Sequence, residues 1–339
     1  MFVPFLLGMF LALNMGGSGT GPSFSAAYGA NVLRKTLIPG LMGLMVFLGA
    51  TLAGQNTAKT LGSGIINPAL INSVLLSIVF FSVAVSLLIA NIAGIPQSTS
   101  QSTVFALVAP AMYFGNFNSN KLFYEILPTW FVLPLLSFIL SFVIGKYIYK
   151  PLRRRGYTIS GKVNDSYLLK GLLIFLSLYV AFSIGSNNVA NATGPLTHMT
   201  LNYFDLDGEN YGWIVSSFSI LIIAPCFGIG SSIFGNKILK NTGKEIVLFG
   251  RIEACIIAFI SASLLLLASL TNGIPSSLVQ LNVAAIIGIG IAKLGAKNIL
   301  RKTEVIKFFF MWILSPIIAF VLCFFLIFLA DHYEILYLF

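Results

Sequence analysis

Long apolar runs alternate with short polar connectors along the whole chain of 339 residues. Several runs reach the ~20 residues that an α-helix needs to cross about 30 Å of hydrocarbon. Residues 67–97 and 308–330 carry no charged side chain at all. The pattern predicts an all-α integral membrane protein with about ten membrane segments, some of which the short connectors allow to be re-entrant. These segments are residues 2–29, 37–54, 70–94, 96–114, 125–149, 168–198, 212–234, 246–271, 275–292 and 308–330.

Basic residues sort to one side of this arrangement. The clearest polar break holds Arg153, Arg154 and Arg155, so the positive-inside rule places it in the cytoplasm. Successive loops should lie on alternate sides of the membrane, starting from this cytoplasmic connector. On that basis 17 of the 20 Lys and Arg residues lie on the cytoplasmic side, Lys59 and Lys121 lie outside, and Arg251 falls just inside a membrane segment. We therefore expect a multi-pass protein of the plasma membrane with both termini outside.

Composition excludes several classes of function. Charged residues make up 9% of the chain, against roughly 25% in soluble globular proteins. The net charge of +10 lies in connectors and does not alternate with stacking aromatics, so nucleic-acid binding is not expected. The chain shows no metal-ligand spacing, no phosphate-cradling loop and no paired carboxylates. We expect no enzyme activity, no metal and no cofactor.

The two halves of the chain resemble each other. Residues 94–101 match residues 273–280 at an offset of 179, and residues 20–22 match residues 193–195 at an offset of 173. Five segments per half is an odd number, so the second half would enter the membrane from the opposite side. The sequence predicts a first repeat over residues 1–155, a cytoplasmic connector over residues 156–167 and an inverted repeat over residues 168–339. Inverted repeats are typical of secondary transporters, which bind substrate near the midplane.

A glycine-rich segment, residues 14–23, lies in the first membrane segment. Its four glycines and one proline disfavour a helix, which predicts a break that restarts near Ser23. The free N–H groups of a restarting helix suit an anion. The alternative is a close crossing of two glycine-lined helices.

The matching segment of the second half holds Asn187, Asn188 and Asn191. Buried amides without partners are costly, so these side chains either join helices or form a polar site.

Each half also carries a Gly-Ile-Pro segment followed by hydroxyl residues and a matching Gln. Proline fits the first turn of a helix, so these hydroxyls either cap it or bind a ligand. The candidate substrate-binding residues are Asn14, Gly16, Gly17, Ser18, Ser23, Ser98, Thr99, Ser100, Asn187, Asn188, Asn191, Ser276 and Ser277. The candidate coupling or gating residues are Gln101, Gln280 and Glu253, an ionisable residue within a membrane segment.

These motifs resemble the inorganic phosphate transporter (PiT) family, which includes sulfate permeases. Residues 185–192, Gly-Ser-Asn-Asn-Val-Ala-Asn-Ala, are similar to its G-A-N-D-V-A-N-A motif, and the Gly-Ile-Pro segments are similar to its G-x-P-x-S-T-T-H motif. Residues 235–243, Glu253 and residues 312–316 also lie where the family has similar residues. The resemblance implies an ion-coupled anion symporter with a duplicated, inverted fold, whose substrate binds between the motifs of the two repeats.

Departures from the family pattern bear on the substrate and the coupling ion. Asn188 and Met15 stand where phosphate carriers of the family have Asp, thought to hold Na⁺, and Gln101 and Gln280 stand where they have His. A site without carboxylates suits sulfate, which carries no proton at neutral pH, although amide oxygens can also accept a hydrogen bond from hydrogen phosphate. The glycine motif with Ser18 and residues 95–100 also resemble the sulfate-permease branch more closely.

The function expected from the sequence is therefore secondary active import of sulfate by proton symport. A phosphate symporter of the same family is the alternative, with Na⁺ as the other possible coupling ion. An anion channel and a membrane receptor or scaffold are alternatives of different classes. The sequence implies contact with membrane lipid and leaves the oligomeric state open, a homodimer included.

Overall fold

The computed structural model describes residues 1–93, 95, 97–154, 166–241 and 250–337. Most of the predicted connector, residues 156–165, lies outside the described residues, as do Arg155, Gly94 and Pro96. The described part is helical and contains no strand, apart from one isolated bridge between Ile66 and Phe117. The prediction of an all-α chain is confirmed. The helices are α1 (Phe2–Gly29), α2 (Ile38–Ala53), α3 (Gln55–Lys59), α4 (Ser73–Ala93), α5 (Thr99–Tyr113), α6 (Leu127–Val143), α7 (Lys150–Arg154), α9 (Tyr167–Asn188), α10 (Ala190–Tyr203), α11 (Gly208–Asn241), α12 (Arg251–Leu270), α13 (Leu278–Leu294), α14 (Ala296–Leu300) and α15 (Thr303–His332).

Eight helical segments in the described residues are long and apolar enough to cross a membrane, fewer than the ten expected. The two predicted segments that fall short are 96–114 and 275–292, which correspond to α5 and α13. These helices have 15 and 17 residues. At ~1.5 Å per residue they span roughly 22 and 26 Å, less than the hydrocarbon core of a bilayer.

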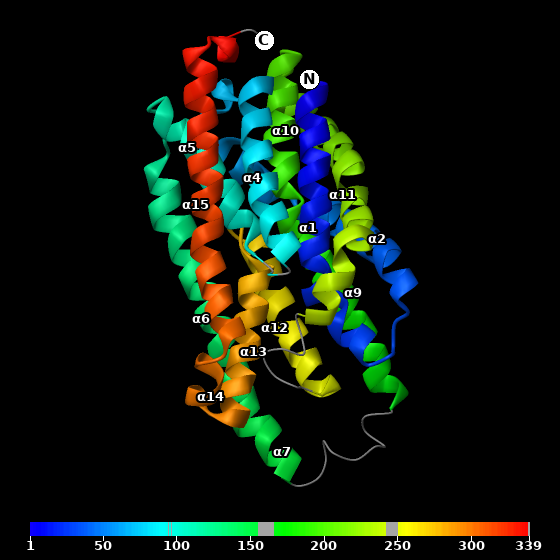
Figure 1. Ribbon diagram of the computed structural model, residues 1–339. Coiled ribbons are helices and arrows are strands. Elements are labelled where there is room, and N and C mark those ends of the chain that lie inside the picture. Colours follow the sequence, from blue (N-terminus) through cyan, green and yellow to red (C-terminus); the bar gives the residue numbers. More distant parts are fainter. Residues whose placement is uncertain (94, 96, 155–165, 242–249, 338–339) are drawn as a thin grey trace.

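The short helices belong to two hairpins that meet in the middle of the molecule. Helix α4 packs against α5 and helix α12 packs against α13. Figure 1 shows the α4–α5 hairpin in the half of the molecule that holds both chain termini and the α12–α13 hairpin in the other half. Helix α7 and the start of α9 lie at the end opposite the two chain termini.

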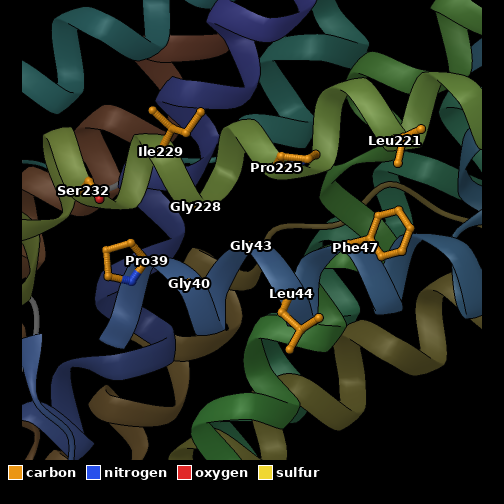
Figure 2. Close-up of a pocket in the computed structure, with 10 residues that line it drawn as sticks. All are labelled: Pro39, Gly40, Gly43, Leu44, Phe47, Leu221, Pro225, Gly228, Ile229 and Ser232. Carbon is orange, nitrogen blue, oxygen red and sulfur yellow. The ribbon is translucent and has the colours of Figure 1, made fainter. Parts of the chain in front are cut away.

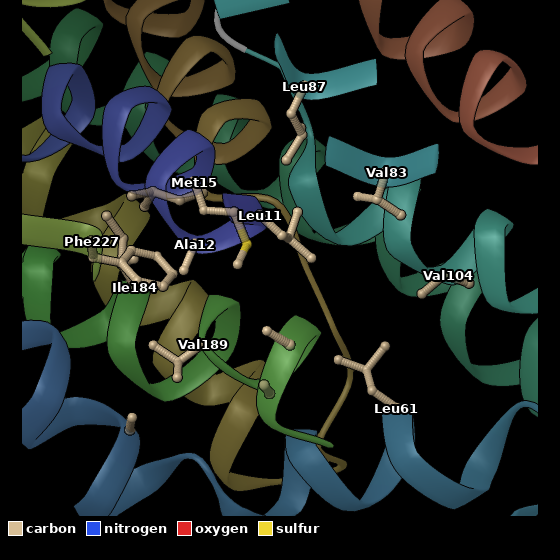
Figure 3. Packing of buried hydrophobic residues seen from close by; sticks show 14 of the residues in the cluster. Leu11, Ala12, Met15, Leu61, Val83, Leu87, Val104, Ile184, Val189 and Phe227 are labelled. Carbon is tan, nitrogen blue, oxygen red and sulfur yellow. The ribbon is translucent and has the colours of Figure 1, made fainter. Parts of the chain in front are cut away.

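The predicted helix break at residues 14–23 is wrong, because α1 continues through the whole glycine-rich segment with Pro22 inside it. The reason is a close crossing with α11. A Cβ atom on Gly16 would lie 2.2 Å from the Phe227 carbonyl oxygen, and one on Gly230 would lie 1.9 Å from the Leu13 carbonyl oxygen. The glycines therefore allow the two backbones to touch, as in small-residue packing between membrane helices. Figure 3 shows Leu11, Ala12 and Met15 of α1 in the core beside Phe227.

The matching segment of the second half contains a small interruption of the helix. Helices α9 and α10 are separated only by Val189, whose dihedral angles (φ −60°, ψ −34°) remain helical. The Val189 carbonyl oxygen accepts bonds from the N–H groups of Ala192 and Thr193. The asparagines therefore lie on either side of a local break in an otherwise continuous rod.

Replacement of Gly16 by Ala should destabilise the protein, because the added Cβ would clash with backbone atoms of α11. Overpacking of this kind costs roughly 1–3 kcal/mol. Gly40→Ala is the matched control, since Gly40 is exposed and a Cβ there would have no neighbour within 4 Å. Thermal unfolding of the detergent-solubilised protein should show a lower midpoint for Gly16→Ala alone. Equal midpoints would contradict the close crossing.

Candidate functional site

The tips of the two hairpins are joined by a reciprocal pair of amides. Gln101 Nε2 donates to Gln280 Oε1 at 3.2 Å, and Gln280 Nε2 donates to Gln101 Oε1 at 2.8 Å. The backbone N–H groups of the same two residues donate to the hydroxyls of Ser98 and Ser277, each at 3.3 Å. Each serine thus caps the helix it precedes. Two helix N-termini, with their partial positive charges, meet at this point.

Hydroxyls and amides extend the junction to neighbouring helices. Ser100 Oγ donates to the Ser276 carbonyl oxygen at 2.9 Å, which joins the hairpin tips a second time. Asn188 Nδ2 donates to Thr99 Oγ1 at 2.8 Å, and Asn191 Nδ2 donates to Ser100 Oγ at 3.3 Å. Both asparagines therefore connect the α9–α10 break to the tip of the first hairpin.

Asn187 holds the tip of the second hairpin. Its Nδ2 donates to Ser269 Oγ at 2.9 Å and to the Ile274 carbonyl oxygen at 3.0 Å, and its Oδ1 accepts from the Ser276 N–H at 2.9 Å. Every polar atom of this buried amide has a partner, so Asn187 positions the extended segment before α13.

A small polar cavity lies beside this junction. It is lined by Ser18 and Gly19 of α1, Gln97 and Thr99 at the first hairpin tip, Ile184 and Asn188 of α9, and Ser277, Leu278 and Val279 at the second tip. No lining residue is ionisable. Gln97 is fully buried and Asn188 is 8% exposed, yet both amide atoms of Gln97 and Oδ1 of Asn188 have no hydrogen-bond partner among the described residues. A buried polar atom without a partner costs roughly 1–3 kcal/mol, so this cavity is the candidate binding site.

Most of the predicted site residues gather here. Ser18, Thr99, Asn188 and Ser277 line the cavity. Those that hold its walls through the bonds above are Ser98, Ser100, Gln101, Asn187, Asn191, Ser276 and Gln280.

Four predicted site residues, all on α1, do not line the cavity. Asn14 donates to the Phe10 carbonyl oxygen and accepts from Asn91 Nδ2. Gly16 and Gly17 pack against α11, and Ser23 Oγ donates to the Gly19 carbonyl oxygen at 2.9 Å. Gly16 and Gly17 thus belong to the crossing with α11, whereas Asn14 bonds within α1 and to α4, and Ser23 bonds within α1.

The protein matches the phosphate transporter family over residues 15–160 and 155–323. The chain belongs to this family. It is 32% identical to the sulfate permease CysP of Bacillus subtilis over 336 residues, which cover 97% of this chain and 89% of the relative. Its fold is similar to that of a solved sodium-dependent phosphate transporter, with a TM-score of 0.81, 19% identity and coverage of 97% of this chain and 98% of the other. The resemblance to a family of membrane anion transporters, and the expectation that the chain is no enzyme, are confirmed.

Two larger hollows lie away from the junction. The groove between α2 and α11 is apolar and carries no charged side chain (Figure 2). It is lined by Pro39, Gly40, Gly43, Leu44, Phe47, Leu221, Pro225, Gly228, Ile229 and Ser232. A second pocket, near the C-terminal end of α10, is lined among others by Lys59, His198, Asp207 and Glu209. The apolar groove offers an oxyanion no donors, and the second pocket mixes charges of both signs.

Glu253 lies outside the cavity of this family member. Its carboxylate is fully buried, contacts Lys293 Nζ at 2.6 Å and accepts the N–H of Gly250 at the start of α12. Lys293 is 13 residues beyond Gln280 on α13, roughly 20 Å along the helix axis. The carboxylate therefore joins the ends of α12 and α13 that lie far from the hairpin tips.

Gln97 is the polar lining residue that the sequence analysis missed, and the apolar or glycine positions it missed are Gly19, Ile184, Leu278 and Val279. Gln97 stands between the Gly-Ile-Pro segment and the cap Ser98, so its position next to a helix start was a signal. The matching position in the second Gly-Ile-Pro segment is Ser276, so comparison of the two segments did not single out Gln97.

Breaking the Glu253–Lys293 pair on one side should destabilise the protein more than removing it whole. A buried charge that loses its partner typically costs about 3–5 kcal/mol. Lys293→Met should therefore lower the thermal midpoint more than the double change Glu253→Gln with Lys293→Met. A double-mutant cycle of unfolding midpoints measures this coupling. Additive effects would show that the two side chains act independently.

Proposed function

We propose that this member of the phosphate transporter family is a secondary active permease that imports sulfate by proton symport. The observation that carries the proposal is the cavity without ionisable groups where two helix N-termini meet. Sulfate has no proton at neutral pH and only accepts hydrogen bonds. Helix N–H groups, hydroxyls and amides supply donors, and no carboxylate in the lining repels the dianion. The 32% identity to a sulfate permease supports the same substrate.

Charge supports coupled transport over passive flow. The lining contains no Lys or Arg, and two helix N-termini supply together about one positive charge. Moving a dianion into a cell against 100 mV costs about 4.6 kcal/mol. Uptake against that potential therefore needs cations to accompany the anion.

The hairpins support an inverted arrangement in the membrane. We propose that α4–α5 and α12–α13 are re-entrant hairpins that enter from opposite sides, one in each repeat, with both chain termini outside the plasma membrane. The matching serine caps and the reciprocal Gln101–Gln280 pair support this relation between the halves. Movement of one set of segments against the other around the fixed site would then give alternating access.

Protons are the proposed coupling ion because the positions associated with Na⁺ in the family hold Asn188 and Met15. Glu253 is the one acidic side chain that is fully buried in the described part of the chain, so it is the proposed proton carrier. Its distance from the cavity makes coupling indirect, through α12 and α13.

Phosphate is the second candidate substrate. The unpartnered oxygens Gln97 Oε1 and Asn188 Oδ1 could accept a hydrogen bond from the P–OH group of hydrogen phosphate. In that case this chain would transport phosphate, like the phosphate carriers of the family, and not sulfate.

Proteoliposomes loaded with buffer should accumulate labelled sulfate when an inward proton gradient is imposed. A sodium gradient of equal size is the control for the coupling ion, and labelled phosphate is the control for the substrate. Phosphate accumulation without sulfate uptake would contradict the substrate assignment. Sulfate that equilibrates but never accumulates would indicate an anion channel instead.

Asn188→Asp should alter coupling or selectivity, because it places a carboxylate against Thr99 in the cavity wall. We expect weaker sulfate uptake and a new response to a sodium gradient, measured as initial uptake rates in the same proteoliposomes. Unchanged transport at a normal expression level would show that Asn188 is not part of the binding site.

A further inference from the structure

Gln97 differs from every other polar side chain around the hairpin tips. It is fully buried, its Nε2 and Oε1 both lack a partner among the described residues, and it lines the cavity. A buried amide that makes no bond costs free energy for each of its polar atoms. In this structure the polar groups of Gln97 therefore do not stabilise the fold.

The equivalent position in the second repeat shows what a structural role would look like. Ser276 donates its N–H to Asn187 Oδ1, accepts Ser100 Oγ on its carbonyl oxygen and directs its own hydroxyl to the Ile274 carbonyl oxygen. Ser276 thus makes hydrogen bonds with its N–H, its carbonyl oxygen and its hydroxyl, while the side-chain amide of Gln97, at offset 179 from it, has no hydrogen-bond partner among the described residues.

The other side-chain amide of the lining, that of Asn188, already donates one hydrogen bond within the protein. Asn188 Nδ2 donates to Thr99 Oγ1 at 2.8 Å, which leaves its Oδ1 as an acceptor in the cavity. The hydroxyl of Ser18 donates to the Met15 carbonyl oxygen at 3.0 Å. Among the lining residues that the structure describes, Gln97 is the amide whose NH₂ group remains available to an anion.

We propose that Gln97 is a ligand of the transported oxyanion and determines its selectivity, an inference that rests on the proposed function. Its NH₂ group donates to an oxygen of sulfate beside the N-terminus of α5, in the place where a carboxylate would repel the dianion. A neutral amide at this position favours an oxyanion without a proton, and an acidic side chain would favour hydrogen phosphate, which can donate its proton to a carboxylate.

The test compares purified Gln97→Leu and Gln97→Glu proteins with the wild type in detergent. Binding is measured as the rise in unfolding midpoint on titration with sodium sulfate or sodium phosphate, with sodium chloride to correct for salt. Loss of a hydrogen bond to a charged ligand weakens affinity on the order of 10- to 100-fold. Gln97→Leu should show this loss for sulfate, with an unliganded midpoint equal to or above that of the wild type because an unpaired amide has been removed.

Gln97→Glu keeps the side-chain volume and should shift the ratio of phosphate to sulfate affinity by on the order of 10-fold toward phosphate. Ser261→Ala is the matched control, because Ser261 is also fully buried with an unpartnered hydroxyl but does not line the cavity. It should leave both affinities unchanged.

The outcomes separate the two proposals. A folded Gln97→Leu protein with wild-type sulfate affinity would overturn the role of Gln97 alone, as would a Gln97→Glu protein with an unchanged ratio. If the wild type binds phosphate and not sulfate, the substrate assignment fails, and Gln97→Leu must then weaken phosphate binding for the ligand role to stand. A wild type that binds neither oxyanion would overturn both.

Discussion

Two helices, α5 and α13, begin at buried residues of this protein, and the candidate site depends on how their first N–H groups are satisfied. A helix start leaves four N–H groups without partners in its own helix, and at membrane depth such irregular backbone is tolerated only when it is buried in protein or lines a cavity. Here Ser98 and Ser277 cap the two starts, while Gln101 and Gln280 tie them together. The cavity lined by Ser18, Gln97 and Asn188 lies beside these two helix starts.

The surrounding helices hold this junction in place. Asn187 fixes the second tip, and Asn188 and Asn191 fix the first, so the short interruption at Val189 connects to both hairpins. The close crossing of α1 with α11 sets α1 against the same centre and brings Ser18 to the cavity wall. The polar residues of an otherwise apolar chain are thereby concentrated around one point, which is where a small anion can be recognised without a charged side chain.

The helical architecture could be predicted from the sequence because apolar runs of this length have few other solutions. The Gly-Ile-Pro segments marked the hairpin tips because proline and serine are favourable at helix starts. The break in α1 was predicted wrongly because helix propensity is a local quantity. The glycines of α1 are compensated by contacts with Phe227 and Gly230, which lie more than 200 residues away in the sequence. The pairing of Glu253 with Lys293 and the missing partners of the Gln97 amide are likewise products of packing, and the local sequence predicts neither contact pattern.

The central claim is that the oxyanion binds where the two hairpin tips meet. The most direct measurement is a crystal structure of the protein soaked with selenate, which has the shape and charge of sulfate and whose selenium atom can be located by anomalous scattering. The account predicts one strong anomalous peak between the first turns of α5 and α13, within hydrogen-bond distance of Gln97. A peak only in the pocket beside Lys59 and His198, with none at the hairpin tips, would contradict it.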